Sequence, residues 1–331
     1  SEPRTRRKKC PLIPVKPNTQ KHAIIMDEEL LKKIKEKYEA QGEDPNVYLK
    51  GLLHQKPVNY WEYIDVETLL SLQRTKTGYH DETVFIVYHQ ITELVLKLMI
   101  HELKVLTGEE TPSHDVMVDK LSRLNRYTSM LINSFAVMTR GMSYDDYNEF
   151  RMSLAPASGF QSAQFRLIEL YCTDMKNLIH DSVKKDVPQD AGTRELFDYL
   201  YWQQAGYDRK TGKKSLMLRQ FEDKYLDEFV ELAERMKTRN LDVRSAHYNP
   251  DNPEDKKVIN ALRVFDRAYN IDWPIVHLET ANTYLAKKGA KKRATGSSDW
   301  QKYLHPAYQR RKFFPKVWSS AELENWAKDR L

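Results

Sequence analysis

The sequence predicts an all-α protein built as a bundle of several helices, and two observations lead to this. Apolar residues recur at helical spacing along most of the chain, whereas the strict apolar and polar alternation of strands is scarce. The 11 glycines are never closer than six positions apart, so the glycine fingerprints of nucleotide-binding α/β folds are absent. With 331 residues, of which 40% are hydrophobic, the chain can bury a large core.

The individual helices are predicted from their caps and apolar stripes. Asp27 precedes an amphipathic stretch as an N-cap would, with Met26 packed on Leu31 as a hydrophobic staple. A nearly uninterrupted apolar run from Val84 to Leu106 predicts a long helix that ends at Thr107-Gly108. Further helices are expected over residues 66–73, 121–138 (with a stop at Gly141), 160–171, 194–236 and 254–288.

Two segments are predicted to be flexible. Residues 1–21 carry seven Lys or Arg against one Glu, and Pro11, Pro14 and Pro17 stiffen the segment, which predicts a mobile basic arm. Residues 289–298 are rich in Gly, Ala, Thr and Ser, as loops are. The remaining chain, 22–331, is expected to form a single all-α domain, with a possible helical insertion at about 194–253.

Composition narrows the class of protein. Outside the arm, 46 basic residues balance 46 acidic ones, which argues against nucleic-acid binding by the folded body. Cys10 and Cys172 cannot build a disulfide framework, so a reducing cytoplasm is the expected location. The arm leads into prolines and not into an apolar signal core, and no run reaches the ~20 uncharged apolar residues of a membrane span. We therefore expect neither export nor membrane insertion.

A histidine inside the long apolar run is the first candidate for chemistry. Phe85 and His89 lie four residues apart and so share one helical face. An imidazole on a helix that is apolar nearly all round is hydrogen-bonded, metal-bound or open to a ligand, since an unpaired buried polar group costs about 1–3 kcal/mol. The ordinary alternative is a core histidine whose hydrogen bonds are satisfied.

A second histidine, His277, follows Trp273-Pro-Ile-Val on a predicted helix. A neutral imidazole among apolar residues is suited to be the proximal ligand of a haem iron, and the chain has no Cys-x-x-Cys-His site for covalent haem. No His-Glu-x-x-His occurs, and no histidine has a Glu three residues before it, so zinc-protease and di-iron patterns fail. A scattered site of two histidines and one carboxylate stays open.

Three other groups offer substrate contacts, each with an ordinary alternative. Tyr147 and Arg151, four apart, present a phenol and a guanidinium suited to one carboxylate, although Arg151 is equally typical of a surface ion pair. An aromatic edge in Tyr60-Trp-Glu-Tyr-Ile64 fits a pocket wall or plain core packing. The hydroxyls from Thr295 to Ser298 fit a closing loop or a linker.

Taken together, these segments resemble the tryptophan 2,3-dioxygenase family of all-helical haem enzymes, from about residue 58 to the C-terminus. The matching motifs are Tyr60-Trp-Glu-Tyr-Ile64, Phe85-Ile-Val-Tyr-His89-Gln90, Tyr147-x-x-x-Arg151, Ser158-Gly-Phe-Gln-Ser162 with Gln164-Phe-Arg166 and Ile168-Glu169, Trp273-x-x-x-His277, and Phe313-Phe-Pro315 with Trp318.

The resemblance implies a role for each candidate residue. His277 would be the proximal ligand of one noncovalent haem b per subunit, and His89 the distal histidine that faces the indole N–H. The indole pocket would be lined by Phe85, Tyr60, Tyr63, Ile64 and Leu154. The substrate contacts would be Arg151 and Tyr147 at the carboxylate, with Thr295 and Ser298 in the closing loop.

The activity implied is insertion of both atoms of O2 into the indole C2–C3 bond of L-tryptophan, giving N-formylkynurenine, the first step of tryptophan catabolism by the kynurenine route. The family is a cytoplasmic homotetramer in which an N-terminal segment of one subunit helps to close a neighbour's pocket. Four residues from Ala294 to Trp300 depart from the family's loop, and Val95 replaces a tryptophan. These changes leave open a related haem monooxygenase acting on a modified tryptophan or a tyrosine, whereas a haem carrier would have no use for a carboxylate clamp.

Overall fold

The structure is a computed structural model of the chain, and it describes residues 27–154, 159–208, 212–285 and 304–328. It divides into two compact units, residues 1–70 and residues 71–331, which are described separately. The predictions of a mobile arm at 1–21 and a flexible loop at 289–298 lie outside the described residues.

The first unit is made of short helices with exposed side chains. Its helices are α1 (Glu28–Glu39), α2 (Pro45–Leu52), α3 (Tyr60–Tyr63) and α4 (Val66–Leu70). The carboxylate of Asp27 accepts from the backbone N–H groups of Glu29 and Leu30, which confirms the predicted cap. Tyr38 of α1 stacks on Tyr48 of α2 with ring centroids 3.9 Å apart. No residue from 27 to 70 is buried, so this unit has no core of its own.

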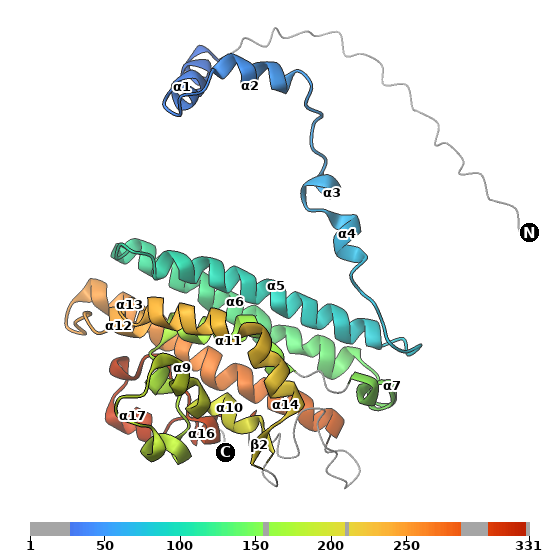
Figure 1. The fold of residues 1–331 in the computed structure, drawn as a ribbon, viewed down its shortest axis with the longest axis vertical. Coiled ribbons are helices and arrows are strands. Elements are labelled where there is room, and N and C mark those ends of the chain that lie inside the picture. Colours follow the sequence, from blue (N-terminus) through green and yellow to red (C-terminus); the bar gives the residue numbers. More distant parts are fainter. Residues whose placement is uncertain (1–26, 155–158, 209–211, 286–303, 329–331) are drawn as a thin grey trace, which may run out of the picture. The chain divides into compact units, whose positions relative to one another are not determined.

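The second unit is an all-α bundle, as predicted (Figure 1). The long helix α6 packs against α5, α13 and α14, and α8 packs against α5 and α11. The bounds of the longer helices are α5 (Glu82–Leu106), α6 (His114–Gly141), α7 (Tyr144–Phe150), α8 (Ala163–Cys172), α11 (Leu216–Met236), α13 (Pro253–Arg267) and α14 (Trp273–Leu285).

Short elements join these helices. They are η1 (Arg151–Leu154), η2 (Gly159–Gln161), η3 (Met175–Leu178), η4 (Asp181–Asp186), α9 (Thr193–Leu196), η5 (Phe197–Tyr199), α10 (Tyr201–Ala205), β1 (Tyr207–Asp208), β2 (Lys213–Lys214), α12 (Leu241–Ser245), the π-helical η6 (Ala268–Asp272), α16 (Pro306–Gln309), η7 (Pro315–Val317) and α17 (Ser320–Glu324).

Serine caps fix where the long helices begin. The hydroxyls of Ser113, Ser162 and Ser215 accept from the third backbone N–H of α6, α8 and α11, respectively. Helix α5 ends at the predicted position, where the N–H of Thr107 donates to the carbonyl of Leu103. The predicted ends of α5 and α6 are thus confirmed.

The prediction of a continuous helix over residues 194–236 is wrong in its middle. The chain forms the antiparallel pair β1 and β2 there, with Tyr207 opposite Lys214. Gly206, which precedes this pair, packs closely against α11. A Cβ added at Gly206 would lie 2.7 Å from the side chain of Leu218. Gly212 returns the chain with φ +65°, a conformation that favours glycine. Similarly, α4 ends at Leu70 and does not reach residue 73.

The helix predicted over residues 254–288 is confirmed as far as Leu285, with an irregularity. The π-helical turn η6 separates α13 from α14. Pro274 lies in the first turn of α14, and a proline has no N–H to donate to the carbonyl of Asn270. The wide turn therefore lies where the regular hydrogen-bond ladder is interrupted, and it sets the register of α14.

By length and composition alone, α5 could cross a membrane. The core helix of a bundle passes the same test, and α5 packs against α6 and α8. Its buried side chains include Leu96, Met99 and Leu103. Packing in the bundle accounts for this part of its apolar surface, whereas Ile91, Leu94, Leu98 and Val105 of α5 are exposed.

Candidate functional site

Aromatic rings connect the two candidate histidines, which lie on helices far apart in the sequence. His89 projects from α5 and meets Tyr88 edge-on, with ring centroids 5.5 Å apart. Tyr88 contacts Phe135 of α6 at 5.5 Å, and Phe135 stacks on His277 of α14 at 5.6 Å. The structure thus brings His89 and His277 to one aromatic cluster formed by three helices.

The backbone fixes the proton on the ring of His89. Its Nδ1 lies 2.7 Å from the carbonyl oxygen of Phe85, one turn earlier. Because a carbonyl oxygen can only accept, the neutral ring carries its proton on Nδ1, which leaves Nε2 as a hydrogen-bond acceptor. Nε2 has no hydrogen-bond partner among the described residues. This arrangement suits a ligand that presents an N–H group.

His277 is held neutral by its surroundings. Burial and, to a smaller extent, the nearby His89 together lower its pKa to about 4. Burial also lowers the pKa of His89. Solvent nevertheless reaches both side chains. Both imidazoles are therefore accessible to a ligand, and their lowered pKa values leave them uncharged at neutral pH.

The predicted carboxylate clamp lies beside the same cluster. The ring of Phe85 packs on His89 at 4.2 Å and faces Tyr147 at 6.1 Å. Burial raises the pKa of Tyr147, while the positive charge of Arg151 opposes this rise, which places the two side chains near each other. Arg151, at the start of η1, is buried. A protonated phenol and a buried guanidinium are donors suited to a carboxylate.

The other predicted site residues lie in three different parts of the chain. Leu154, at the end of η1, packs against the main hydrophobic core. Tyr60, Tyr63 and Ile64 belong to the first unit and are exposed. Thr295 and Ser298 lie outside the described residues.

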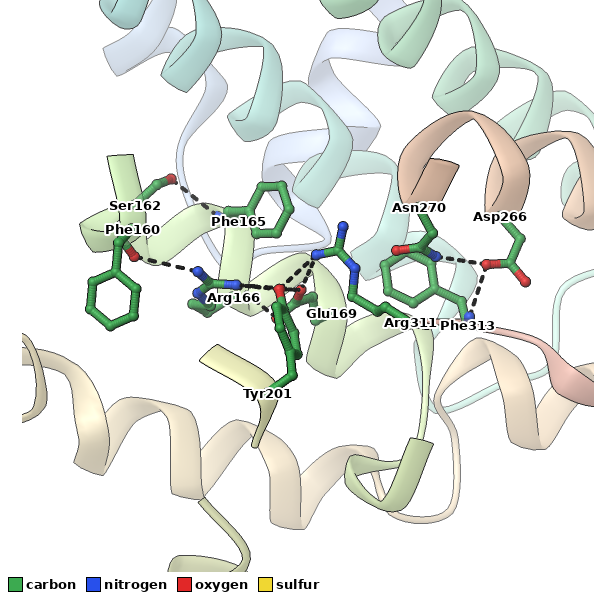
Figure 2. A network of polar contacts seen from close by, with 10 residues as sticks. All are labelled: Phe160, Ser162, Phe165, Arg166, Glu169, Tyr201, Asp266, Asn270, Arg311 and Phe313. Carbon is green, nitrogen blue, oxygen red and sulfur yellow. Dashed lines mark hydrogen bonds and ion pairs between the residues drawn. The ribbon is translucent and has the colours of Figure 1, made fainter. Parts of the chain in front are cut away.

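The sequence prediction missed a buried polar network that joins α8, α10 and the C-terminal segment (Figure 2). The carboxylate of Glu169 on α8 accepts from Arg311 at 2.6 Å and from the Tyr201 hydroxyl at 2.5 Å. Arg166 lies 3.4 Å from the same carboxylate. Burial raises the pKa of Tyr201 to about 12, so its hydroxyl remains a donor. Arg166 and Glu169 are three residues apart in the sequence, but nothing local identifies Arg311 as their partner.

Aromatic rings link this network to the helix of His277. The guanidinium groups of Arg166 and Arg311 lie 5.0 and 5.1 Å from the ring centre of Phe165. Phe165 packs on Trp273 at 5.2 Å, one helical turn before His277. Tyr269 forms a second link, since it lies 5.8 Å from the guanidinium of Arg311 and packs on Trp273 at 5.1 Å, so the network contacts the start of α14 through two aromatic rings.

A second buried carboxylate, that of Asp266, holds the C-terminal segment to the end of α13. It accepts from the backbone N–H of Phe313 at 2.8 Å and of Phe314 at 3.2 Å. The indole N–H of Trp318 and the amide of Asn270 donate to it at 2.9 and 2.7 Å. Four donors compensate for the burial of this group, which lies immediately before the π-helical turn.

The described residues contain no group of three or more His, Cys, Asp or Glu side chains that could hold a metal ion. The two-histidine, one-carboxylate alternative thus has no support in this part of the chain. A single histidine ligand to a haem iron needs no such group.

Comparison with known proteins finds matches that share one name. Residues 51–197 match the family model described as tryptophan 2,3-dioxygenase, which includes α5 and α7. A tryptophan 2,3-dioxygenase of Geobacillus thermodenitrificans is 28% identical over 287 residues, which is 80% of this chain and 92% of that protein. The enzyme of Bacillus thuringiensis is 36% identical over 38% of this chain and 47% of its own length. Tryptophan 2,3-dioxygenase 2 of Ralstonia nicotianae is 42% identical over 35% and 34%, respectively.

The fold and the site define a mainly helical protein with an aromatic site centred on two neutral histidines. The motifs that form this site and the relatives just described agree on one family. The chain is similar to tryptophan 2,3-dioxygenases, through the family model over residues 51–197 and through a relative 28% identical over 80% of this chain.

Proposed function

We propose that this protein is a haem-dependent dioxygenase that inserts both atoms of O2 into the indole C2–C3 bond of L-tryptophan to give N-formylkynurenine, the first step of tryptophan catabolism by the kynurenine route. The observation that carries the proposal is the pairing of a neutral, ligand-accessible His277 with a His89 whose Nε2 is left as an acceptor. The relatives are named as dioxygenases, and nothing in them favours the monooxygenase alternative.

The residues fit a noncovalent haem b, one per subunit. An axial imidazole must be unprotonated on its ligating nitrogen, and burial keeps His277 neutral. Neither ring nitrogen of His277 has a hydrogen-bond partner among the described residues, and Phe135 stacks on the ring and limits its rotation. When bound, haem supplies the activation of O2 that the side chains alone cannot provide.

The chain's own residues would orient the substrate. Phe85 offers an aromatic face to the indole, and Nε2 of His89 would accept a hydrogen bond from the indole N–H. Arg151 would pair with the substrate carboxylate, and Tyr147 would donate to it. Positioning of this kind is a large part of what a protein contributes to such a reaction. We assign Thr295 and Ser298 to the closing loop on the resemblance alone.

The first unit supports a homotetramer. Tyr60 and Tyr63 are 72% and 82% exposed, and none of the described residues of their unit, 27–70, is buried. Exposed aromatic side chains of this kind are typical of interaction surfaces. In the family, an N-terminal segment closes the pocket of a neighbouring subunit, and we propose the same role for Tyr60, Tyr63 and Ile64. The functional domain would then span residues 22–331, in a cytoplasmic enzyme.

The product formed from L-tryptophan tests the proposal. Haem-loaded, reduced protein supplied with L-tryptophan and ¹⁸O2 is expected to give N-formylkynurenine carrying two labelled oxygen atoms, measured by mass spectrometry. A product with a single labelled oxygen and an intact indole ring would instead identify a monooxygenase.

Arg151→Ala tests whether Arg151 binds the carboxylate of the substrate. Removing one partner of a buried charged pair costs about 2–5 kcal/mol, so catalytic efficiency should fall roughly 30-fold or more. Tryptamine, which lacks the carboxylate, should bind the wild type much more weakly than tryptophan does. Equal binding of the two would show that Arg151 does not hold the carboxylate.

His89→Ala should reduce activity without abolishing it. His89 would accept the indole N–H hydrogen bond and orient the ring, so the loss is expected to be about 10²-fold or less with haem retained. The wild type should prefer tryptophan to 1-methyltryptophan, which has no N–H, and the variant should lose that preference. Complete inactivity with haem intact would make His89 an essential base and contradict this role.

A further inference from the structure

A polar hollow lies away from the histidine cluster, where the ends of α5 and α11 meet α8. Its volume is about 250 Å³, enough for a small ligand. The buried side chains of Tyr171, Leu232 and Met236 contribute to its lining. The other lining residues are Lys104, Thr107, Gly108, Glu109, Arg235 and Arg239.

Three cations line this hollow without ion-pair partners. The side chains of Lys104, Arg235 and Arg239 form no ion pair or hydrogen bond with any described residue. Glu109 is the only acidic residue of the lining, so positive charge is in excess. Elsewhere in the described chain, other cations do pair: Lys120 of α6, for instance, lies 2.8 Å from Glu102 of α5.

Two donors in the hollow are also unused. Nε of Arg239 is enclosed by protein and has no hydrogen-bond partner. The hydroxyl of Tyr171 makes no hydrogen bond to the described residues. Burial raises the pKa of Tyr171, although Arg235 and Arg239 oppose the rise, so the phenol stays protonated as a donor near both guanidinium groups. Leaving such donors unmatched is costly unless a ligand or water accepts from them.

The carbonyl ends of the two helices do not account for this charge. Cations are common at helix C-termini, where the dipole amounts to about half a negative charge. At the end of α5, however, Arg244 already donates to the carbonyls of Leu106 at 2.7 Å and Glu110 at 3.2 Å. Burial lowers the pKa of Arg244, and the charge of Arg239 adds to that effect, so the cations also repel one another.

We propose that this hollow is a binding site for a small phosphate-bearing anion. Tetrahedral phosphate oxygens accept from several directions at once, which matches donors arriving from Lys104 on α5, Tyr171 on α8 and the two arginines at the end of α11. The hollow has room for a small anion but is too small for a protein or nucleic-acid partner. The site is separate from the candidate carboxylate clamp at Arg151.

Calorimetric titration of the full-length protein with inorganic phosphate and with pyrophosphate tests this proposal. We expect saturable binding of one pyrophosphate per chain, tighter than phosphate because two groups reach more donors. Arg239→Gln should weaken it about tenfold or more, as expected for loss of a charge-assisted hydrogen bond. Tyr171→Phe, which changes no charge, should weaken it by a smaller factor, about threefold to tenfold.

Lys224→Gln is the matched control. It removes the same charge from an exposed position on α11, about three turns from Arg235, and should leave binding unchanged. Circular dichroism checks that each variant is folded. If Arg239→Gln and Tyr171→Phe both bind pyrophosphate as the wild type does, the anion is held elsewhere, for example by the basic residues of 1–21, and the proposal is overturned. A fall of the same size in Lys224→Gln would likewise overturn it, because binding would then follow net charge alone.

Discussion

His277→Ala is expected to yield a folded protein that purifies largely without haem. The histidine is the only side chain of the described cluster that combines accessibility, neutrality and free ring nitrogens. A noncovalent haem loses its single protein bond to iron when this residue is removed, and only apolar contacts remain. Haem content can be measured from the pyridine haemochrome spectrum, and folding from far-ultraviolet circular dichroism.

An exposed histidine provides the control for this variant. His247→Ala changes a solvent-facing imidazole and should keep a full complement of haem. If His277→Ala retains full haem with an unchanged spectrum, another residue is the proximal ligand and the assignment is wrong. If His277→Ala loses secondary structure, His277→Gln is the variant to use, because it keeps most of the side-chain volume. It should also lose haem.

Glu169→Ala is expected to destabilise the whole second unit. Arg311 and Arg166 are both buried, and removing the carboxylate leaves two guanidinium groups and the Tyr201 hydroxyl without their shared acceptor. Breaking a buried charged pair in this way costs about 3–5 kcal/mol. Since total stabilities are about 5–15 kcal/mol, this loss is a large fraction of the free energy of unfolding, measured by urea titration.

Glu231→Ala, on the exposed face of α11, is the matched control and should change the free energy of unfolding by less than about 0.5 kcal/mol. A loss below about 1 kcal/mol for Glu169→Ala would mean that water replaces the carboxylate at little cost. In that case, the network would not hold the core together.

Much of the fold follows from local sequence. The long helices were predictable because their apolar period, serine caps and stops agree, as at Ser113 and Thr107. The strand pair at 207–214 was not predictable, because two strands of two residues each leave no alternating pattern. The π-helical turn was also missed, although Pro274 marks the interrupted ladder in the sequence.

The candidate site also combines features that local sequence predicts with features that it does not. Phe85 with His89, and Tyr147 with Arg151, are neighbours one helical turn apart, so spacing alone placed them together. The stacking of Phe135 on His277 and the meeting of Glu169 with Arg311 depend on helix packing across long sequence separations, which no local pattern encodes. The roles of all these residues in binding and turnover stay predictions.

The two buried carboxylates have a consequence for the order in which the molecule assembles. Glu169 receives Arg311 from 142 residues further along the chain, and Asp266 receives the N–H of Phe313 from 47 residues further along. During synthesis, both acids must stay in water until the ribosome has released that distant stretch, because closing them inside earlier would strand a charge. The helices can form as they emerge, but the interior can become dry only after translation has passed Phe314.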